Sequence, residues 1–499
     1  MPLFRRPIEQ ELFKHRLRNG RPMTELQFFA KELTAWLASP ARKEMLDGDR
    51  YYMGEHDILA RKRTAIGPDG KLIPVDNMPN NRIVDNQYAK HVDQKANYLL
   101  GQPISFQADN DAYVTEVKKV LGMKFMRTLR NAGVEMLNSG IAWLYPYYGR
   151  DGELVFRLFP GYEILPFWAD AAHTELDAAL RYYPVEVYEG QEDKKIVFKV
   201  DIFKPDGVST YIFENGELRP DPDSTPQSYV TVSTPDGKGA AFNWERFPLI
   251  AIKYNAKEIP LIRRGRSLQD AINLLQSDFV NSMEEDVRNT VLVLKNYDGQ
   301  DLGEFRRNLT TYGAIKVRTV EGTDGGVDSL EINVNADNYK TVLELLKKAL
   351  IENLRSYDAK DDRLSGNPNQ MNIQSMYSDI DLDANAMETE LQAAFEEILW
   401  FVNTHLANTG RGSFEGEDIT VIFNRDILIN ESEAIDNCSK SVGIISDETI
   451  VAMHPWVDDP AAELGRLEKQ KTEAESDAYR QAFETAQQQR ASGGELNEE

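Results

Sequence analysis

Four acidic residues have the spacing of ligands in a calcium-binding loop, at its first, third, fifth and twelfth positions: Asp379, Asp381, Asp383 and Glu390. The sixth position of such a loop requires glycine for a sharp turn, and here it is Ala384. Ile380 and Leu382 continue the apolar spacing of a helix through the same stretch. We therefore expect these carboxylates to lie on a helix surface. A calcium-regulated scaffold, whose stability would change with the ion, is the alternative.

A second group that could do chemistry consists of aromatic residues in strand-like segments: Trp143, Tyr145, Tyr147, Tyr148, Phe156, Phe159, Phe167 and Trp168. Such a face could bind a sugar, and with a pair of carboxylates it could act on one. Alternating aromatic residues in strands more often form the core of a sheet or a subunit interface. We predict a core or an interface, and a glycan-binding or glycan-active protein is the alternative function.

The common catalytic motifs are absent from the sequence. It has no G-x-x-x-x-G-K-[ST] phosphate loop, no G-x-S-x-G elbow and no H-E-x-x-H. The six histidines are scattered, and none stands at ligand spacing from another: His15, His56, His91, His173, His405 and His454. The single cysteine, Cys438, excludes an intramolecular disulfide and fits a reducing cytoplasm during synthesis. We predict that the protein is not an enzyme and holds no metal or cofactor.

The composition limits the classes of partner. With 57 Lys and Arg against 81 Asp and Glu, the 499-residue chain carries a formal charge of −24, so tight DNA binding through a basic surface is not expected. No apolar run approaches the roughly 18 residues of a membrane span, and the basic N-terminus lacks the apolar core of a secretory signal. The length allows two to four domains. Hydrophobic residues make up 41%, which favours a multi-lobed chain covered in part by copies of itself.

Two amphipathic helices flank a strand-rich insert and organise the middle of the chain. The first is predicted from Ser267, as the N-cap, to residue 288, and the second from 338 to Tyr357. Between them, residues 290–295, 312–318 and 327–334 have the composition of strands. Two helices should therefore hold a compact β-unit at their far end.

A polar stretch interrupts the helical pattern after this pair. Gly366 and Pro368 break regular structure between Asp358 and Gln370, and a helix of about 35 residues then runs to Gly410. A strand is predicted at 418–424, followed by a short helical segment capped by Ser446 and by a longer one, polar on all sides, capped by Asp459. The overall class is α+β.

Upstream, helices are predicted over residues 22–66, from Asn80 or Asn81 to Gly101, and over 122–140. The second of these presents one apolar stripe: Val84, Tyr88, Val92, Ala96 and Leu99. Strands follow from 141 to 254, and a polar, proline-containing loop is expected over 219–241.

Three features in order resemble a known family. They are LDGDRYYMGEHDILARKR before NNRIVDNQYAKHVDQKANYLLGQPISF; LVLKNYDG, GAIKV and TDGGVDSLE inside the insert; and VGIISDETIVAMHPWVDDPAAELGRLEKQ near the end. Together they resemble the portal proteins of tailed double-stranded-DNA phages, in the branch typified by siphophages of Gram-positive hosts. The similarity extends from about residue 40 to 475.

The resemblance implies the portal fold, assembled as a ring, normally twelvefold, around a DNA channel at one capsid vertex. It implies a wing at 1–265, stem helices at 266–289 and 338–357, and a clip at 290–337. A tunnel loop at 358–370, a long wing helix at 371–410 and a helical crown with a flexible tail at 411–499 would complete the subunit.

The resemblance also implies partners and site residues. Partners would be the terminase large subunit, the head-completion adaptor, the major capsid and scaffolding proteins and the passing DNA, in the virion and, during assembly, in the host cytoplasm, with no membrane. The clip would contact partners through a polar surface: Glu304, Arg306, Arg307, Lys316 and Arg318. The loop would present these residues to the channel: Lys360, Asp361, Asp362, Arg363, Asn367 and Gln370. Lys360 and Arg363 would make transient phosphate contacts, diluted by the aspartates.

Overall fold

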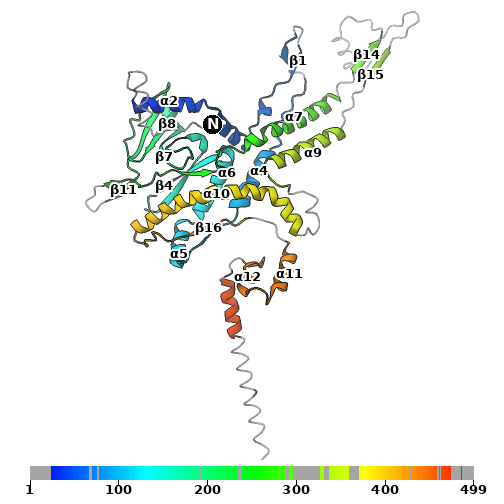
Figure 1. The fold of residues 1–499 in the computed structure, drawn as a ribbon. Helices are drawn as coiled ribbons and strands as arrows, with labels where there is room; N and C mark the ends of the chain where they lie inside the picture. The colour runs from blue at the N-terminus through cyan, green and yellow to red at the C-terminus, as the bar shows by residue number, and fades with distance from the viewer. Residues whose placement is uncertain are drawn as a thin grey trace, which may run out of the picture. The chain divides into compact units, whose positions relative to one another are not determined.

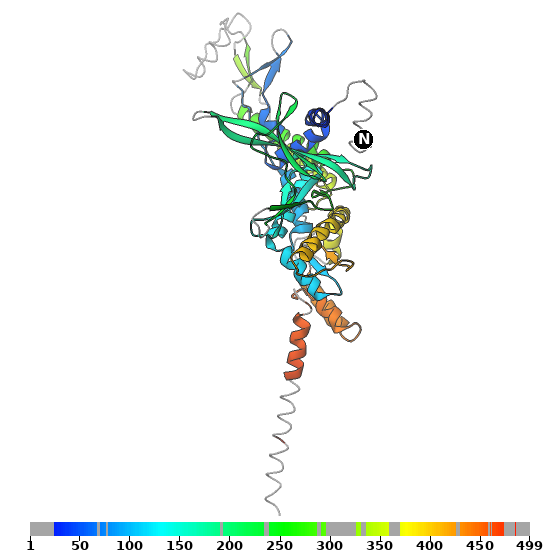
Figure 2. The same ribbon diagram turned by 90° about the vertical axis from the view of Figure 1, so that its left-hand side faces the viewer.

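The computed structural model describes residues 24–66, 70–75, 78–189, 193–233, 239–286, 291–295, 326–330, 336–358, 370–425, 430–457, 460, 462–473 and 485 (Figures 1 and 2). A run of helices is followed by a long run of strands, which pair antiparallel, and then by further helices, which agrees with the predicted α+β class. The chain divides into two compact units. The first unit is Met1–Ser356 with Asp379–Asp426, and the second unit is Tyr357–Ser378 with Ile427–Glu499.

The N-terminal helices begin and end at residues that satisfy free backbone groups. They are α2 (Glu25–Leu37), α3 (Pro40–Tyr52), α4 (Gln87–Leu100), α5 (Asp111–Val120) and α6 (Met123–Ser139). Thr24 forms a capping box with Gln27 at the start of α2. At the end of α6, Gly140 takes a left-handed conformation with φ 79°, which a side chain would strain.

The largest sheet has five antiparallel strands in the order β10-β9-β8-β7-β6. They are β6 (Ile164–Trp168), β7 (Leu176–Glu189), β8 (Asp193–Lys204), β9 (Gly207–Glu214) and β10 (Glu217–Pro220). A second sheet has the order β13-β4-β5, formed by β13 (Ile250–Lys253), β4 (Ile141–Tyr148) and β5 (Leu154–Phe159). Two-stranded sheets pair β1 (Thr64–Ile66) with β2 (Leu72–Pro74), β3 (Ser105–Gln107) with β16 (Thr420–Ile422), and β11 (Val230–Ser233) with β12 (Gly239–Phe242).

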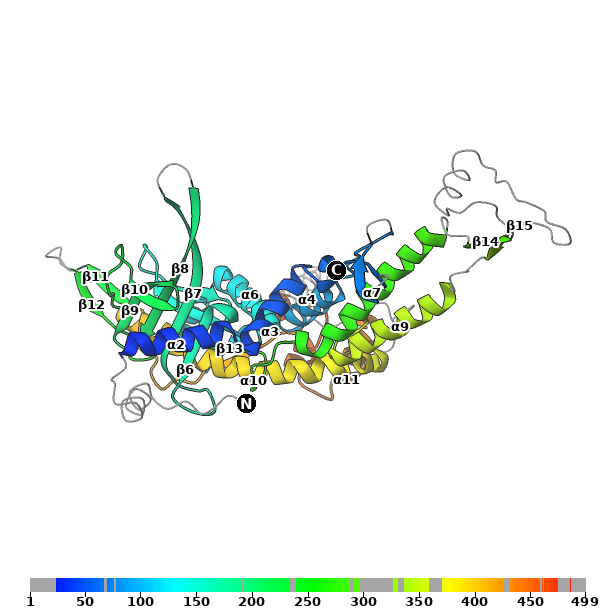
Figure 3. The same cartoon turned by 90° about the horizontal axis from the view of Figure 1, so that it is seen from above.

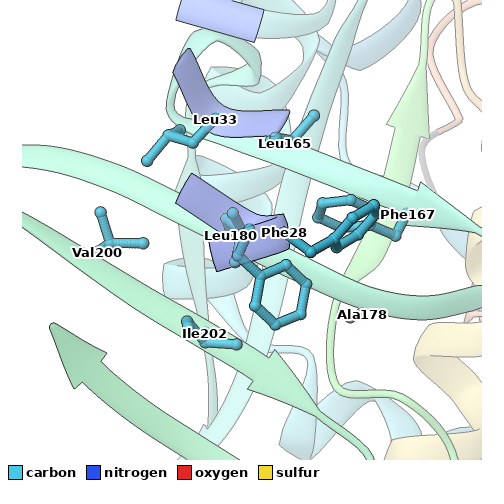
Figure 4. Close-up of a cluster of buried hydrophobic side chains, with 9 residues drawn as sticks. Phe28, Leu33, Leu165, Phe167, Ala178, Leu180, Val200 and Ile202 are labelled. Atoms are coloured by element: carbon cyan, nitrogen blue, oxygen red, sulfur yellow. The ribbon is translucent and has the colours of Figure 1, made fainter. Parts of the chain in front are cut away.

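A hydrophobic core joins α2 to one face of the five-stranded sheet (Figure 4). Phe28 and Leu33 on the helix pack against side chains that alternate along β6, β7 and β8: Leu165, Phe167, Ala178, Leu180, Val200 and Ile202. The aromatic residues of β4 to β6 are also largely internal, with Trp143 fully buried and Phe159, Phe167 and Trp168 at most 5% exposed. The prediction that these aromatics form a sheet core is confirmed for them.

The middle of the chain contains the predicted helix pair. These helices are α7 (Ile262–Asp286) and α9 (Ala336–Asn353), which run side by side (Figure 3). Between them in the chain, β14 (Val291–Lys295) pairs with β15 (Gly326–Leu330). The third predicted strand, at 312–318, lies outside the described residues. Helix α10 (Gln370–Asn408) has 39 residues and confirms the predicted long helix.

Two predicted helix starts are wrong. Ser267 lies inside α7, which begins at Ile262, because the basic first turns of α7 are neutralised by carboxylates of other elements. Helix α4 begins at Gln87 with Asn86 as its cap, and not at Asn80 or Asn81. Residues 81–86 are not helical, and the backbone N–H groups of Asn81, Ile83 and Asp85 bond to side chains of α7 instead.

The second unit contains the start of α10 together with α11 (Glu431–Ser441) and α12 (Asp447–Ala452). Ser446 caps α12, as predicted. Helices α5 and α11 were not predicted, because helices of 10 and 11 residues contain too few turns to repeat an apolar spacing clearly. The predicted cap Asp459 lies outside the described residues.

Candidate functional site

Most of the predicted site residues lie outside the described residues. This holds for the clip set, Glu304, Arg306, Arg307, Lys316 and Arg318, and for the loop set, Lys360, Asp361, Asp362, Arg363 and Asn367. Gln370 is described and is the first residue of α10. Its backbone N–H donates to Glu433 Oε2 at 2.9 Å, and its side-chain Oε1 accepts from Asn430 N at 3.1 Å. A carboxylate at the start of a long helix is favoured by the helix dipole, so Gln370 fixes the start of α10 within the second unit.

A polar ladder on α7 binds residues 81–88, which comprise the segment before α4 and the first two residues of that helix. Four residues spaced by four share one buried face of the helix: Gln269, Asn273, Ser277 and Asn281. Their oxygens accept backbone N–H groups, Asn281 from Asn81 at 2.7 Å, Ser277 from Ile83 at 2.9 Å, Asn273 from Asp85 at 2.9 Å and Gln269 from Tyr88 at 2.9 Å.

The spacing of this ladder has a simple geometric cause. Four residues of helix rise about 6.0 Å, and two residues of extended chain span about 6.6 Å, so the N–H groups of Asn81, Ile83 and Asp85 match side chains spaced by four on α7. The fourth N–H is that of Tyr88, three residues after Asp85, which already lies in α4. Asn273 makes two further hydrogen bonds, because its Nδ2 donates to His56 Nδ1 at 2.7 Å and its Oδ1 also accepts from Gln269 at 3.0 Å. The sequence signal for this ladder is the spacing of four between its polar residues, which puts them on one face of a helix.

Asp85 ties the same segment to α9. Its Oδ2 lies 2.7 Å from Lys347 Nζ and accepts from Gln276 Nε2 at 2.6 Å. Burial alone would raise the pKa of Asp85, but the hydrogen bonds from Lys347, Gln87 and Gln276 lower it below the usual value. The segment is thus held by both helices of the pair.

Helix α9 also packs closely on α7. A Cβ at Gly265 of α7 would lie 2.9 Å from Leu354 and 3.0 Å from Leu350, so glycine permits this approach. Farther along the pair, the rings of Phe279 and Tyr339 are 4.8 Å apart. The two helices therefore contact each other both near the start of α7 and farther along it.

A buried ion cluster gathers around Asp383 of α10. Its carboxylate lies 2.8 Å from Lys95 Nζ, 2.7 Å from Tyr254 Oη and 3.3 Å from Arg264 Nη1. Arg355 Nη1 lies 3.5 Å away, and the Arg355 carbonyl accepts from Lys95 Nζ at 2.9 Å. Burial would raise the pKa of Asp383, but the charge of Lys95 and the hydrogen bonds it receives lower it.

A second ion cluster adjoins the first on the same two helices. Asp381 accepts from Tyr98 Oη on α4 and from Arg425 Nη1, the latter at 2.9 Å. Arg425 also contacts Glu388 at 2.8 Å. Lys95 and Tyr98 are one turn apart on α4, so one face of that helix binds both Asp381 and Asp383 of α10. We name the two clusters together the α4–α10 hub.

The three arginines at the start of α7 are each matched by a carboxylate. Arg263 Nε donates to Glu44 at 2.9 Å, and Arg266 contacts Asp47 at 2.6 Å, while Arg264 joins the hub. Positive charge at a helix N-terminus is unfavourable with the helix dipole, and these acidic partners offset it.

Chemically, these groups neutralise one another and serve as anchors. The acidic residues of the calcium hypothesis lie in α10 rather than in a loop, as expected. The expected position on the helix surface is wrong for Asp383, which is 3% exposed, because it pairs with the buried Lys95. Asp381 is likewise bound to a cation of the protein itself, Arg425. Among the described residues, no cluster of His, Cys, Asp or Glu has the arrangement of a metal site. Within the same residues, no helix is long and apolar enough to cross a membrane.

Comparison with known proteins identifies the class. The chain is 31% identical over 434 residues to the portal protein of Bacillus phage SPP1, which covers 85% of this chain and 83% of that protein. It is 29% identical over 452 residues to the portal protein of Clostridium phage phiCD119, covering 88% and 95%. The class that these matches define is the phage portal protein. The family described as "Phage portal protein, SPP1 Gp6-like" matches residues 40–477, and the chain belongs to it.

Solved structures with a similar chain come from gene transfer agent particles. A chain from the "Neck of empty GTA particle computed with C6 symmetry" matches with a TM-score of 0.39 at 12% identity, over 72% of this chain and 87% of that one. A chain from a "Virion of native gene transfer agent (GTA) particle" matches with a TM-score of 0.37 at 11% identity, over 80% and 97%. Proteins of the portal family are structural, form oligomeric rings in phage particles and belong to the virion at the capsid vertex. The predicted family and fold class are confirmed.

Proposed function

We propose that this portal protein assembles a ring, normally of twelve copies, through which the terminase motor packages the genome and from which the genome is later ejected. The ring also docks the head-completion adaptor, and it is built in the host cytoplasm together with capsid and scaffolding proteins. The observation that carries the proposal is the family match over residues 40–477. ATP hydrolysis belongs to the motor, and this chain is a conduit without enzymatic activity.

The regions of the subunit follow from the same proposal. Helices α7 and α9 are the stem, the segment between them is the clip, and residues 358–370 form the tunnel loop. The part up to about residue 265 and most of α10 form the wing, and the part after α10 forms the crown. The braced helix pair supports this assignment, because a stem that transmits load between clip and wing needs fixed geometry.

The charge of the chain suits a channel for sliding DNA. A net charge of −24 disfavours a tight grip on phosphate, which would slow translocation. Lys360 and Arg363 are then transient contacts, and Asp361 and Asp362 keep them weak. In the clip, Arg306, Arg307, Lys316 and Arg318, mixed with Glu304, suit a polar interface that exchanges one partner for another.

Electron microscopy of the purified chain, with native mass spectrometry for the subunit count, tests the ring. A ring with a central hole is expected. A compact monomer at high concentration would contradict the proposal.

If the chain forms rings, a pair of substitutions in the proposed tunnel loop tests its phosphate contacts. Replacing Lys360 and Arg363 by Ala should change packaging rate or DNA retention in intact rings. The control removes two charges from α5, Lys118 and Lys119, and should change neither. Unchanged packaging in the loop variant would refute the phosphate contacts.

The clip assignment has its own test. Charge reversal at Arg306 and Arg307 should weaken binding of the motor and of the adaptor while the ring still assembles. Binding that matches the unchanged ring would refute a role for these arginines.

A further inference from the structure

One hairpin of the five-stranded sheet extends past its neighbouring strands. Strand β6 pairs with β7 no farther than Arg181, and β9 pairs with β8 no farther than Lys199. Beyond these residues β7 and β8 pair only with each other among the described strands (Figure 3). We call this part, residues 182–189 and 193–198, the β7–β8 ribbon. A two-stranded ribbon is at best marginally stable in water, so packing against a further surface would stabilise it.

The apolar face of the sheet continues onto this ribbon. Side chains at alternate positions share one face, and the register of β7 and β8 runs through the ribbon without a shift. Along β8 this face carries Ile202, Val200, Phe198 and Ile196, which are 3%, 0%, 38% and 56% exposed. The first two belong to the core with α2, and the last two do not. The core side of the sheet is thus extended by apolar side chains that remain open to solvent.

The ribbon face carries no net charge. On β7 it adds Pro184 and Tyr188, both exposed, and Tyr188 is 74% exposed. Its two charged side chains, Glu186 and Lys194, form an ion pair with each other. DNA binding requires a basic surface, so this face does not suit DNA. Depletion of charge is instead typical of the centre of a protein–protein interface.

The size and charge of the face favour a neighbouring copy of this chain as its partner. Tyr188, Ile196 and Phe198 expose on the order of 300 Å² together, whereas a stable complex buries about 800 Å² on each partner. The ribbon alone is therefore too small to hold an independent partner, but it can add to the contacts of a ring, where the neighbour is already close. Two copies with a charge of −24 each repel one another, and uncharged faces meet at the lowest cost.

A ring also needs a second, different surface on each copy, because one face of a subunit meets another face of the next. The paired strands β11 and β12 provide such a surface. One face of this pair carries Val230, Val232, Ala240 and Phe242 and has no charged residue. Val232 is 49% exposed and Phe242 is 55% exposed, so this face is also open to solvent.

We propose that the β7–β8 ribbon packs across the subunit boundary onto the β11–β12 face of the neighbouring copy. The inference rests on the proposed ring and assigns residues that join its copies. On assembly, Ile196 and Tyr188 lose their exposure against Val232 and Phe242 of the next subunit.

Photo-crosslinking in the purified full-length chain tests this contact. The photoreactive residue p-benzoylphenylalanine replaces Ile196 in one variant and Lys195, which is exposed on the opposite face of the same strand, in the control. After irradiation, the Ile196 variant should give at least fivefold more product with the mass of two chains on a denaturing gel. Mass spectrometry should place the second attachment in the peptide that contains Phe242.

A charge on the ribbon face should weaken assembly. Ile196→Glu places a carboxylate in the contact and should raise the concentration at which half of the chain is in rings at least tenfold, as measured by mass photometry on dilution. The matched control Lys195→Glu introduces the same side chain on the opposite face, with a larger change of charge, and should alter that concentration less than twofold. Both positions are exposed, so both variants should keep the urea midpoint of the unchanged protein.

The contact is overturned if the Ile196 product is absent, equals that of the Lys195 control, or attaches outside the β11–β12 face. Crosslinks confined to one chain would also overturn it, because the ribbon would then fold back on its own subunit. Equal effects of Ile196→Glu and Lys195→Glu on assembly would do the same. Native mass spectrometry of the same sample separates the two proposals: a monomer refutes the ring and the contact with it, whereas a ring without the product refutes the contact alone.

Discussion

Replacing Asp383 should lower the free energy of unfolding more than replacing its ion-pair partner Lys95. Removing one partner of a buried ion pair costs about 3–5 kcal/mol when the other is left uncompensated. In Asp383→Asn, Lys95, at 1% exposure, keeps only a carbonyl and lies near two guanidinium groups. We therefore expect the free energy of unfolding of the first unit to fall by about 3–5 kcal/mol.

Lys95→Met should cost less. Asp383 keeps the Tyr254 hydroxyl at 2.7 Å and the guanidinium groups of Arg264 and Arg355 at 3.3 and 3.5 Å, so its charge remains compensated. A loss of about 1–3 kcal/mol is expected, and the double variant should lose less than the sum of the two single changes.

Urea unfolding followed by tryptophan fluorescence measures these differences. The control Arg246→Gln breaks an ion pair whose side chains are 44% and 45% exposed, so it should change the free energy by about 0–1 kcal/mol. The pKa of Asp383 is lower in the folded protein than in the unfolded chain. The stabilisation that its charged form gives to the folded state is therefore complete above the unfolded pKa of about 4, and it is lost as the pH falls through the folded pKa. If Lys95→Met costs as much as Asp383→Asn, or if both match the control, the reasoning is refuted.

Three further predictions concern other parts of the first unit. Asn273→Ala leaves the Asp85 N–H without its acceptor and should lower the free energy of unfolding by about 1–3 kcal/mol in urea, and a loss no larger than that of an exposed alanine substitution would contradict the ladder. Gly140→Ala should cost about 1–3 kcal/mol in the same assay, because φ is 79° and the new Cβ would lie 2.3 Å from a carbonyl oxygen, and a Tm equal to that of the unchanged protein would exclude this strain. Burial raises the pKa of Glu135 to about 7, so its stabilising contribution, complete below about pH 4, is lost as the pH rises through 7. Glu135→Gln should therefore be more stable than the unchanged protein at pH 8, by about 3 kcal/mol, and equal pH profiles for the two proteins would disprove the shift.

Long amphipathic elements were predictable because their apolar spacing is repeated many times. Helix α10 was predicted nearly to its ends, and the α7 and α9 pair was found with errors of a few residues. The starts of α4 and α7 were missed because the groups that decide them are distant in sequence. Asn80 and Asn81 look like caps, but nothing local reveals that the N–H groups beyond them bind a helix some 190 residues later.

The hub was missed although the sequence carried a signal for it. Lys95 lies on the apolar stripe of its helix, between Val92 and Ala96, where a lysine is rarely buried without a partner. That pattern indicates a buried ion pair, but it cannot name Asp383, 288 residues farther along the chain. The predicted clip and loop residues stay predictions, since they lie outside the described residues.

The ladder on α7 also determines how the segment 81–85 responds to force. A pull along the segment strains all of its hydrogen bonds to α7 at once, because they are arranged side by side along the direction of pull. A pull away from α7 would break them one after another, at a much lower peak force. The segment is therefore a shear joint, strong along the helix axis, and a single-residue insertion between Asn81 and Asp85 would remove this strength by turning the wrong N–H groups toward the helix.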